Sequence, residues 1–394
     1  SMSKNTQKNK STVWSDSVDV YGFKAVKFAG SLLSQSIRSD LFRLFNWPHI
    51  MPTMVNLLVT YRCNSKCLNC NMWQYYRDAP DKAKNEMTFE EFKTFVDNNS
   101  FLQDITLGGG EVFLRNDIVK MWMYLDERGY RTGATTNSLN IKDIIEKETK
   151  LLAGLSGRNA HTLQISIDGF SETHDRIRAI PGNFSKAMEL LKWALDMEKK
   201  YPFFKASISH TICQENYKEF PSFIDYYVNM GISPGQISFR VAHHAPIVYG
   251  NLETLSCVEN KDELIGIVES VINKYSDYKN DLFVKGIIEN IKNPDKLLIP
   301  CYAAFTFCHI DPFWNVYPCV QLDNILGNLR DYGFRIKDFW HTEIITKARK
   351  NIKDGQCPNC WTRCATARSM VSSTANILKL AIHEKNRIFK INGG

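Results

Sequence analysis

The sequence Cys63-Asn-Ser-Lys-Cys67-Leu-Asn-Cys70 places three cysteines at C-x-x-x-C-x-x-C spacing, directly after the apolar run Met54–Tyr61. Closely spaced cysteine thiolates are the ligands that proteins use for iron–sulfur clusters. An ordinary electron-transfer cluster takes four thiolates, whereas three can hold three corners of a cubic cluster and leave the fourth iron open. The stretch therefore predicts that a substrate or cofactor completes the fourth iron.

Apolar, strand-like runs alternate with helical patterns between residues 54 and 242. The capping box Thr88-Phe-Glu-Glu91 opens one helix, and Asp117–Arg128 and Phe184–Lys199 have helical periodicity. Six such units predict an α/β fold, because right-handed crossovers curl a parallel sheet toward a partial (β/α)6 barrel. Catalytic residues belong at the C-terminal strand ends, where Cys63 stands. The expected strands are Val55–Thr60, Ile105–Leu107, Thr132–Thr136, Leu163–Ile167, Ala206–Ile212 and Ile237–Val241.

Three further motifs follow the expected second, third and fourth strands. They are Gly108-Gly-Gly-Glu111, Thr136-Asn137 and Ser166-Ile-Asp168-Gly169, and His174–Arg178 comes next. Each alone is an ordinary turn signal. As an ordered set with the cysteines, over roughly residues 54 to 242, they resemble the radical S-adenosylmethionine (radical SAM) superfamily. The resemblance implies a TIM-like partial barrel and a [4Fe–4S] cluster on Cys63, Cys67 and Cys70, with SAM on the open iron.

The resemblance also implies which residues contact SAM. Gly109 and Gly110 would allow SAM to approach the backbone where a side chain would obstruct it, and Glu111 would accept a hydrogen bond from the SAM ammonium. The ribose hydroxyls would meet Ser166 and Asp168, and the SAM carboxylate would meet Arg178. An aromatic residue commonly precedes the third cysteine in this family, but Asn69 stands here, so Trp73 or Met72 would take over the adenine contact. The residues in this set are Gly109, Gly110, Glu111, Ser166, Asp168, Arg178 and Trp73.

Other departures from the family pattern leave the expected ligands in place. Val112 replaces the proline that commonly follows the Gly-Gly-Glu motif, and Ser138 replaces a glycine after Asn137. The implied chemistry is reductive cleavage of SAM to methionine and a 5′-deoxyadenosyl radical, which abstracts a substrate hydrogen atom. The protein would position that C–H bond and exclude water.

A second group of cysteines begins at residue 301, in a small segment that needs a stabilising metal or cluster. Its pattern, ending Cys357-Pro-Asn-Cys360-Trp-Thr-Arg-Cys364, resembles the SPASM/twitch extension of radical SAM enzymes, which holds auxiliary [4Fe–4S] clusters. Six cysteines instead of seven imply one auxiliary cluster. The implied ligands are Cys301, Cys319, Cys357 and Cys360, with Cys308 and Cys364 as alternates. Two cysteine pairs also fit a tetrahedral zinc site, which is the structural alternative.

The chain has 394 residues, of which 44% are hydrophobic, enough for one large and one small domain. The expected division is an N-terminal tail and amphipathic helix at 1–50, the barrel at 51–245, a connecting segment at 246–299 and the auxiliary-cluster domain at 300–394. The connecting segment predicts one helix, near Lys261–Tyr275.

Composition indicates the compartment. Eleven cysteines at short spacings fit metal ligation in a reducing cytoplasm better than a disulfide framework, and Cys213 and Cys257 are expected to be packing residues. No apolar run reaches the roughly 18 residues of a spanning helix. Residues 23–47 have the pattern of a basic amphipathic helix, which either lies on a membrane surface or closes the bottom of the barrel.

Three functions remain open from the sequence. The first is a radical SAM enzyme that oxidises, crosslinks or epimerises a peptide or protein side chain, with an external electron donor such as flavodoxin or ferredoxin. The second modifies a small alcohol, sugar or lipid-linked substrate. The third is a zinc-containing nucleic-acid-binding protein, although a net charge of +7 with dispersed basic residues favours no nucleic-acid partner. His243 and His244, after the sixth strand, are candidate substrate-site or proton-transfer residues.

Overall fold

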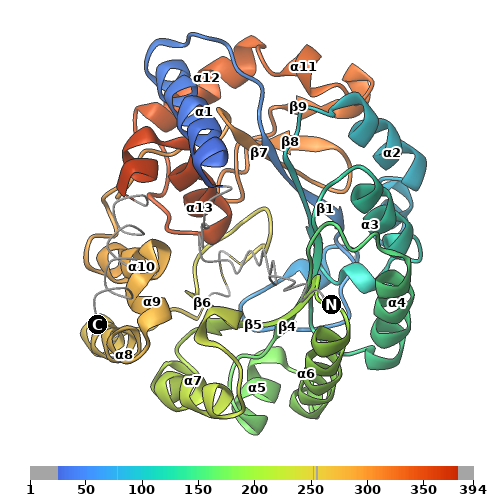
Figure 1. Ribbon diagram of the computed structural model, residues 1–394, viewed down its shortest axis with the longest axis vertical. Helices are drawn as coiled ribbons and strands as arrows, with labels where there is room; N and C mark the ends of the chain where they lie inside the picture. The colour runs from blue at the N-terminus through green and yellow to red at the C-terminus, as the bar shows by residue number, and fades with distance from the viewer. Residues whose placement is uncertain (1–24, 78, 252, 254–255, 380–394) are drawn as a thin grey trace, which may run out of the picture.

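The computed structural model describes residues 25–77, 79–251, 253 and 256–379. Parallel strands alternate with helices along the first half of the chain, and the helices cover the outside of the curled sheet (Figure 1). The strands are β1 (Met54–Thr60), β2 (Asp104–Gly109), β3 (Thr132–Thr136), β4 (His161–Ser166), β5 (Phe204–Ile212) and β6 (Ile237–Val241). The helices are α2 (Phe89–Asn98), α3 (Ile118–Glu127), α4 (Ile141–Gly154), α5 (Ser171–Arg178), α6 (Asn183–Lys200) and α7 (Phe220–Asn229).

Local sequence explains these elements. The capping box of α2 is confirmed, because the Glu91 amide donates to the Thr88 hydroxyl at 3.2 Å and the Thr88 amide donates to the Glu91 carboxylate at 2.9 Å. The inner faces of α2 and α3 bury Phe92, Phe95 and Trp122 against the sheet. Burial of this apolar face holds each helix to the strands, since short helices are marginal alone.

The barrel is partial. Strands β3, β4, β5 and β6 form one parallel hydrogen-bonded ladder, and β1 and β2 belong to a second ladder beside it. The six predicted strands and the α/β barrel are therefore confirmed. Each of the loops that carry the predicted motifs leaves the C-terminal end of a strand, as a parallel barrel requires.

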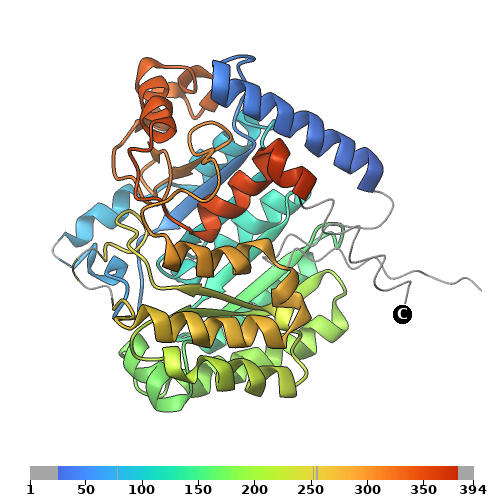
Figure 2. The same cartoon turned by 90° about the vertical axis from the view of Figure 1, so that its left-hand side faces the viewer.

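The Cys-rich segment joins this sheet. Strand β7 (Phe307–Ile310) pairs in parallel with β1, with Leu57 opposite Ile310, and β8 (Asn315–Tyr317) and β9 (Gly327–Asn328) follow in antiparallel order. Helices α11 (Ile336–Phe339), α12 (Glu343–Lys353) and α13 (Arg363–Ser372) complete it. Figure 2 shows α13 beside both α1 and α10, in agreement with its packing contacts.

The connecting segment contains more structure than the sequence predicted. Besides the expected helix, α8 (Lys261–Lys274), it forms α9 (Ser276–Asn280) and α10 (Leu282–Lys292). Helix α8 packs against α7, and the Tyr278 hydroxyl of α9 donates to the Ile237 carbonyl of β6 at 3.1 Å. The prediction of a single helix was therefore wrong, since these helices continue the outer layer of the barrel.

Helix α1 (Ala25–Phe45) occupies most of the predicted 23–47 stretch, and Phe23 and Lys24 lie outside the described residues. It packs along α13, and the Gln103 side chain, just before β2, donates to Gln35 at 3.3 Å. Among the helices that the described ranges contain, none is both long and apolar enough to cross a membrane. Short 3-10 helices link the elements, at Met72–Gln74, Pro80–Asn85, Val112–Leu114, Tyr217–Glu219, Pro234–Gln236 and Leu329–Tyr332.

Candidate functional site

The three-cysteine loop leaves the end of β1 and folds against two neighbouring loops. The Leu68 amide donates to the Ile177 carbonyl at 2.9 Å, which ties the loop to α5. Partly buried thiols line it, and burial raises the pKa of Cys63 and of Cys70 to about 12. A thiol that burial keeps neutral becomes a thiolate when a metal coordinates it. The donor set of three clustered thiols therefore suits a metal cluster.

The glycines of the Gly-Gly-Glu motif pack against this loop. The Gly110 amide donates to the Thr60 carbonyl at 3.0 Å, and the Glu111 amide donates to the Arg62 carbonyl at 2.8 Å. An added Cβ at Gly109 would lie 2.4 Å from the Thr60 oxygen, and one at Gly110 would lie 2.3 Å from the Arg62 oxygen. These two glycines are therefore required by the packing of the chain's own backbone, and their predicted contact with SAM stays a prediction.

Glu111 organises the loop that follows β3. Its carboxylate, 1% exposed, accepts from the Thr136 hydroxyl at 3.0 Å and the Asn137 amide at 2.8 Å through Oε2. Oε1 accepts only from the Phe113 amide, at 3.3 Å, among the described residues, so one more donor can bind there. Burial raises the pKa of Glu111 to about 7, although these hydrogen bonds oppose the rise.

Asp168 and Arg178 form an ion pair beside the cysteines. An Arg178 Nη2 donates to Asp168 Oδ2 at 2.6 Å, and Nη1 lies 3.6 Å from the Cys67 sulfur. The other Asp168 oxygen accepts from the Thr211 amide at 2.8 Å. Burial acts to raise the pKa of Asp168, but Arg178 holds it below its ordinary value. Asp168 therefore orients Arg178, and its predicted contact with the ribose hydroxyls stays a prediction.

Two buried donors near the cysteine loop have no hydrogen-bond partner among the residues that the structure describes. They are Nε of Arg178 and the indole Nε1 of Trp73. Ser166, at the end of β4, is buried as well. Unpaired buried donors are costly, so such atoms point to a ligand that would pair with them.

The rim of the barrel contains residues that the sequence analysis missed. Tyr249 is half-buried and accepts from Arg240 Nη1 at 3.2 Å, and Arg240 Nη2 donates to Ser209 at 2.6 Å. Burial raises the pKa of Tyr249, and Cys364 and Cys70 add to the rise. Its phenol therefore lies between the two cysteine-rich regions. The signal in the sequence was a cation, Arg240, inside the expected strand Ile237–Val241.

The two rim histidines differ in environment. Nδ1 of His243 lies 3.1 Å from the Val241 carbonyl, and its ring centroid is 5.9 Å from that of Tyr249. Burial lowers the pKa of His243 to about 4, so it is neutral at pH 7. His244 is exposed. His243 therefore faces the rim beside Tyr249, whereas His244 faces solvent.

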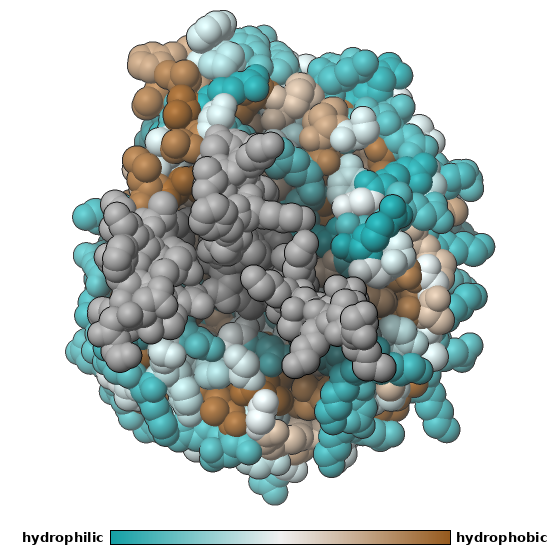
Figure 3. Space-filling view, viewed as in Figure 1, coloured by the Kyte–Doolittle hydropathy of each residue, from teal (hydrophilic) through white to brown (hydrophobic). Residues whose placement is uncertain are grey.

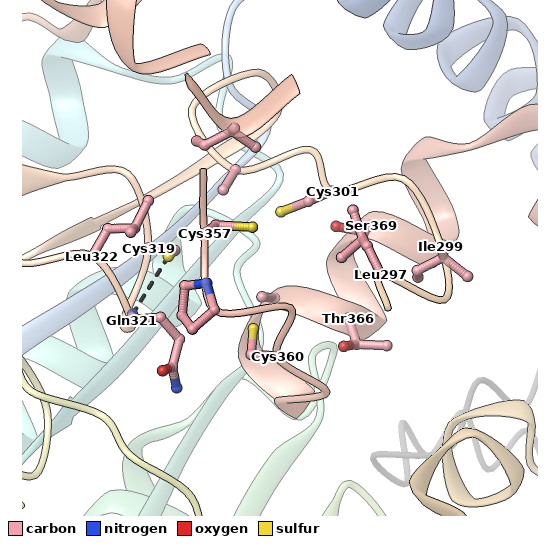
Figure 4. A pocket seen from close by; sticks show the side chains of 14 residues that line it. Leu297, Ile299, Cys301, Cys319, Gln321, Leu322, Cys357, Cys360, Thr366 and Ser369 are labelled. Carbon is pink, nitrogen blue, oxygen red and sulfur yellow. Dashed lines mark hydrogen bonds between the residues drawn. The ribbon is translucent and has the colours of Figure 1, made fainter. Parts of the chain in front are cut away.

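Four cysteines of the C-terminal segment line one pocket with about 460 Å³ of empty space (Figure 4). They come from three places in the chain: Cys301 precedes β7, Cys319 follows β8, and Cys357 and Cys360 lie between α12 and α13. Apolar side chains such as Leu297 and Ile299 form the walls. The Gln321 amide donates to the Cys319 sulfur at 3.4 Å, and burial raises the pKa of Cys301 to about 12.

The remaining cysteines lie elsewhere. Cys308 is in the hydrophobic core, and Cys364 is exposed in the first turn of α13. Cys213 is buried in a small apolar cluster as predicted, but Cys257 is exposed, so its assignment as a packing residue was wrong. Within the described ranges no three His, Cys, Asp or Glu side chains converge on a point that could hold a single metal ion.

Comparison with known proteins agrees with this geometry. The family model described as the Radical SAM superfamily matches residues 57–227. The AdoMet-dependent heme synthase of Methanosarcina barkeri is 25% identical over 343 residues, which are 81% of this chain and 91% of that protein.

Solved structures share the fold. Streptococcus suis SuiB bound to precursor peptide SuiA has a TM-score of 0.56 at 14% identity, covering 87% of this chain and 76% of that one. Native anSMEcpe with bound AdoMet and Cp18Cys peptide has a TM-score of 0.55 at 17% identity, covering 85% and 98%. At these identities the likeness concerns the fold alone.

Proposed function

Because the chain belongs to the radical SAM superfamily through its domain at residues 57–227, we propose that Cys63, Cys67 and Cys70 hold a [4Fe–4S] cluster that binds SAM. When bound, this pair supplies a 5′-deoxyadenosyl radical that abstracts a hydrogen atom from the substrate. The observation that carries the proposal is that three loops at strand ends meet. The Glu111 amide hydrogen-bonds to the loop that contains the three cysteines, and the Arg178 guanidinium lies beside the Cys67 sulfur of the same loop.

The residues around the cysteines would hold SAM. Oε1 of Glu111 has room for the ammonium, and the free Nε of Arg178 suits the carboxylate. The Asp168 contact fixes the guanidinium in that orientation. The unpaired indole N–H of Trp73 is available to a polar atom of the adenine or ribose, and Ser166 to a ribose hydroxyl. Burial of these groups excludes water from the radical site.

The pocket of Cys301, Cys319, Cys357 and Cys360 would hold one auxiliary [4Fe–4S] cluster, which makes the C-terminal segment of SPASM/twitch type. Four thiols in one largely apolar pocket, one buried and three partly buried, satisfy the ligand requirement of such a cluster. An auxiliary cluster suits a net two-electron oxidation, since it can accept the electron left after hydrogen abstraction. The first electron would come from an external donor such as flavodoxin or ferredoxin.

The substrate that we propose is a peptide or protein side chain, which the enzyme oxidises, crosslinks or epimerises. The support is the fold that this chain shares with two peptide-bound structures, SuiB with SuiA and anSMEcpe with Cp18Cys. A second candidate is a small or lipid-linked substrate, because a relative aligned over most of both chains is an AdoMet-dependent heme synthase. For either class, Arg240 and Tyr249 stand at the rim that the substrate must pass.

Iron analysis tests the cluster assignments. After anaerobic reconstitution, two cubane clusters predict about eight irons per chain, and Cys360→Ser should leave about four. Cys308→Ser is the matched control, because Cys308 is a cysteine of the same segment that does not line the pocket. A chain that binds about four irons together with zinc would contradict the auxiliary cluster.

Turnover tests the central chemistry. The triple change of Cys63, Cys67 and Cys70 to alanine should abolish 5′-deoxyadenosine formation from SAM and dithionite. Persistent formation would show that the SAM site is wrongly assigned. To separate the substrate classes, host extract can be divided by ultrafiltration and tested for stimulation of 5′-deoxyadenosine formation. Stimulation that protease treatment destroys supports a peptide substrate, whereas stimulation by the untreated small-molecule filtrate that survives protease supports the second class.

A further inference from the structure

Helix α1 turns several of its polar side chains toward the protein. Ser36 and Ser39 are buried, and the Ser36 hydroxyl lies 3.2 Å from that of Thr374. Asp40 accepts from the Tyr302 hydroxyl and, at 3.0 Å, from the Thr374 amide. These contacts fasten the inner face of α1 to the end of α13 and the start of the Cys-rich segment.

The same helix presents apolar side chains to solvent. Ile37, Leu44 and Phe45 are exposed on α1, and Trp47 follows directly, with Phe45 71% and Trp47 70% exposed. Figure 3 shows apolar residues gathered over α1 and the neighbouring helix α12, at the upper left of the view. Exposing such side chains has a cost, since each large apolar side chain gains free energy when removed from water. We call the side chains of Ile37, Leu44, Phe45, Trp47 and Ile344 the apolar face.

Helix α12 adds positive charge beside the apolar face. The Lys353 ammonium donates to the Leu44 carbonyl at 2.9 Å, which places the end of α12 beside the end of α1. Stacked His49 and His341 rings, 4.8 Å apart, place the start of α12 beside the segment after Trp47. Ile344 is 56% exposed on α12 and continues the apolar face. Exposed cations surround it at Arg38, Lys347, Lys350 and Lys353, against the exposed acids Glu343 and Asp354.

Anchoring keeps this surface rigid. Arg43 Nε donates to the Cys301 carbonyl at 3.0 Å, and the Arg349 guanidinium stacks 4.8 Å from the centre of the buried Phe42 ring. The apolar face is therefore held by the fold and does not depend on α1 folding upon binding. A preformed surface binds without the entropic cost of ordering a helix.

We propose that the apolar face docks on the surface of a lipid bilayer that contains anionic lipids. Aromatic and aliphatic side chains bordered by lysine and arginine are the composition of interfacial helices, where apolar groups enter the headgroup boundary and cations meet lipid phosphates. A second copy of the chain fits less well, since it would bring the same excess of cations against itself. The proposal is independent of the SAM chemistry, because the apolar face contains no residue of the SAM site.

Vesicle flotation of the full chain tests the proposal. Vesicles of phosphatidylcholine with 30% phosphatidylglycerol, a composition chosen for the test, should carry the protein upward, and pure phosphatidylcholine should carry at least threefold less. The double variant Phe45→Ser/Trp47→Ser should lose at least tenfold of the bound fraction. Both side chains are largely exposed, so the fold should tolerate the change. The matched control is Tyr226→Ser, an exposed aromatic residue on α7.

Charge and oligomeric state give further readouts. Lys347→Glu/Lys350→Glu should weaken binding to anionic vesicles and leave binding to neutral vesicles unchanged. Equal flotation of wild type and the Phe45/Trp47 variant, or none with either lipid, would overturn the proposal. The proposal would also be overturned if the wild type is a dimer that the Phe45/Trp47 variant converts to a monomer, or if flotation requires removal of residues 1–24. Iron content and 5′-deoxyadenosine formation without vesicles should stay at wild-type levels, so failure here is distinguishable from failure of the proposed function.

Discussion

The packing of the Gly-Gly-Glu loop makes Gly110→Ala a sharp test of the SAM site. A Cβ at Gly110 would lie 2.3 Å from the Arg62 carbonyl oxygen, 2.7 Å from its carbon and 2.9 Å from the Cys63 Cβ. Because two of these atoms are backbone, no rotamer change can relieve the contact. The loop that begins the three-cysteine sequence must move instead.

The magnitude follows from what the movement breaks. Inserting a methyl group into a close-packed site costs about 1–3 kcal/mol. The hydrogen bonds from Gly110 to Thr60 and from Glu111 to Arg62 are each worth about 1 kcal/mol. The total, roughly 3–5 kcal/mol, destabilises the loop conformation that binds the cluster. Since about 1.4 kcal/mol is tenfold in an equilibrium, the competent population should fall at least tenfold.

The assay is 5′-deoxyadenosine formation after anaerobic reconstitution, with iron content measured on the same sample. Gly110→Ala should reduce the rate at least tenfold and retain about four irons, those of the second site. Gly108→Ala is the control two positions earlier, because its added Cβ would meet only the flexible Leu58 side chain at 3.4 Å. If the two variants have equal rates, the loop contact does not support the SAM site and the reasoning fails.

Two further substitutions probe the second site and the core. Gly286→Ala should remove the iron of the auxiliary site, because the added Cβ would lie 1.9 Å from the ring of Trp361, the residue next to Cys360. Gly266→Ala is the control and should keep this iron, because the space around Gly266 is open. Equal iron content in the two variants would contradict the prediction. Burial lowers the pKa of His309 to about 3 and leaves both ring nitrogens without a partner among the described residues. Below about pH 6.5 the unfolded chain therefore binds a proton at His309 that the folded chain does not bind. The free energy of unfolding should fall by about 2 kcal/mol between pH 7 and pH 5 for this reason. Urea unfolding at the two pH values should show that the unfolding free energy of His309→Leu falls by about 2 kcal/mol less than that of the wild type. An identical fall in the variant and the wild type would refute the prediction.

Local patterns explain why the barrel could be predicted. The strands β1 to β6 are short segments rich in apolar and β-branched residues, and the motifs stand at their C-terminal ends in chain order. Strand β7 was missed because its four residues, Phe307–Ile310, become a strand only by pairing with β1, more than 250 positions earlier in the chain. Such long-range pairing has no signature in the short segment itself.

In the candidate site, too, local sequence patterns could be predicted and long-range contacts could not. Residue types and order indicate which side chains gather near the cysteines, but not how they are paired. Asp168 carries no sequence signal that its partners are Arg178 and Thr211, and the contact of Gly110 with Arg62 depends on two loops meeting. The six C-terminal cysteines likewise left alternatives open. Cys308 is buried in the core by tertiary packing, which cannot be predicted from the spacing of the cysteines.

Helix α13 connects the four-cysteine pocket to the strands of the barrel. On one side, Thr366 and Ser369 line the four-cysteine pocket. On another, the Arg368 guanidinium donates to the Asn56 side chain of β1 at 2.8 Å and to Thr106 of β2 at 3.1 Å. The helix is thus a wall shared by the pocket and the strands of the barrel. Because one rigid helix contacts both, the distance between the proposed clusters is fixed by packing, as electron transfer between them would require.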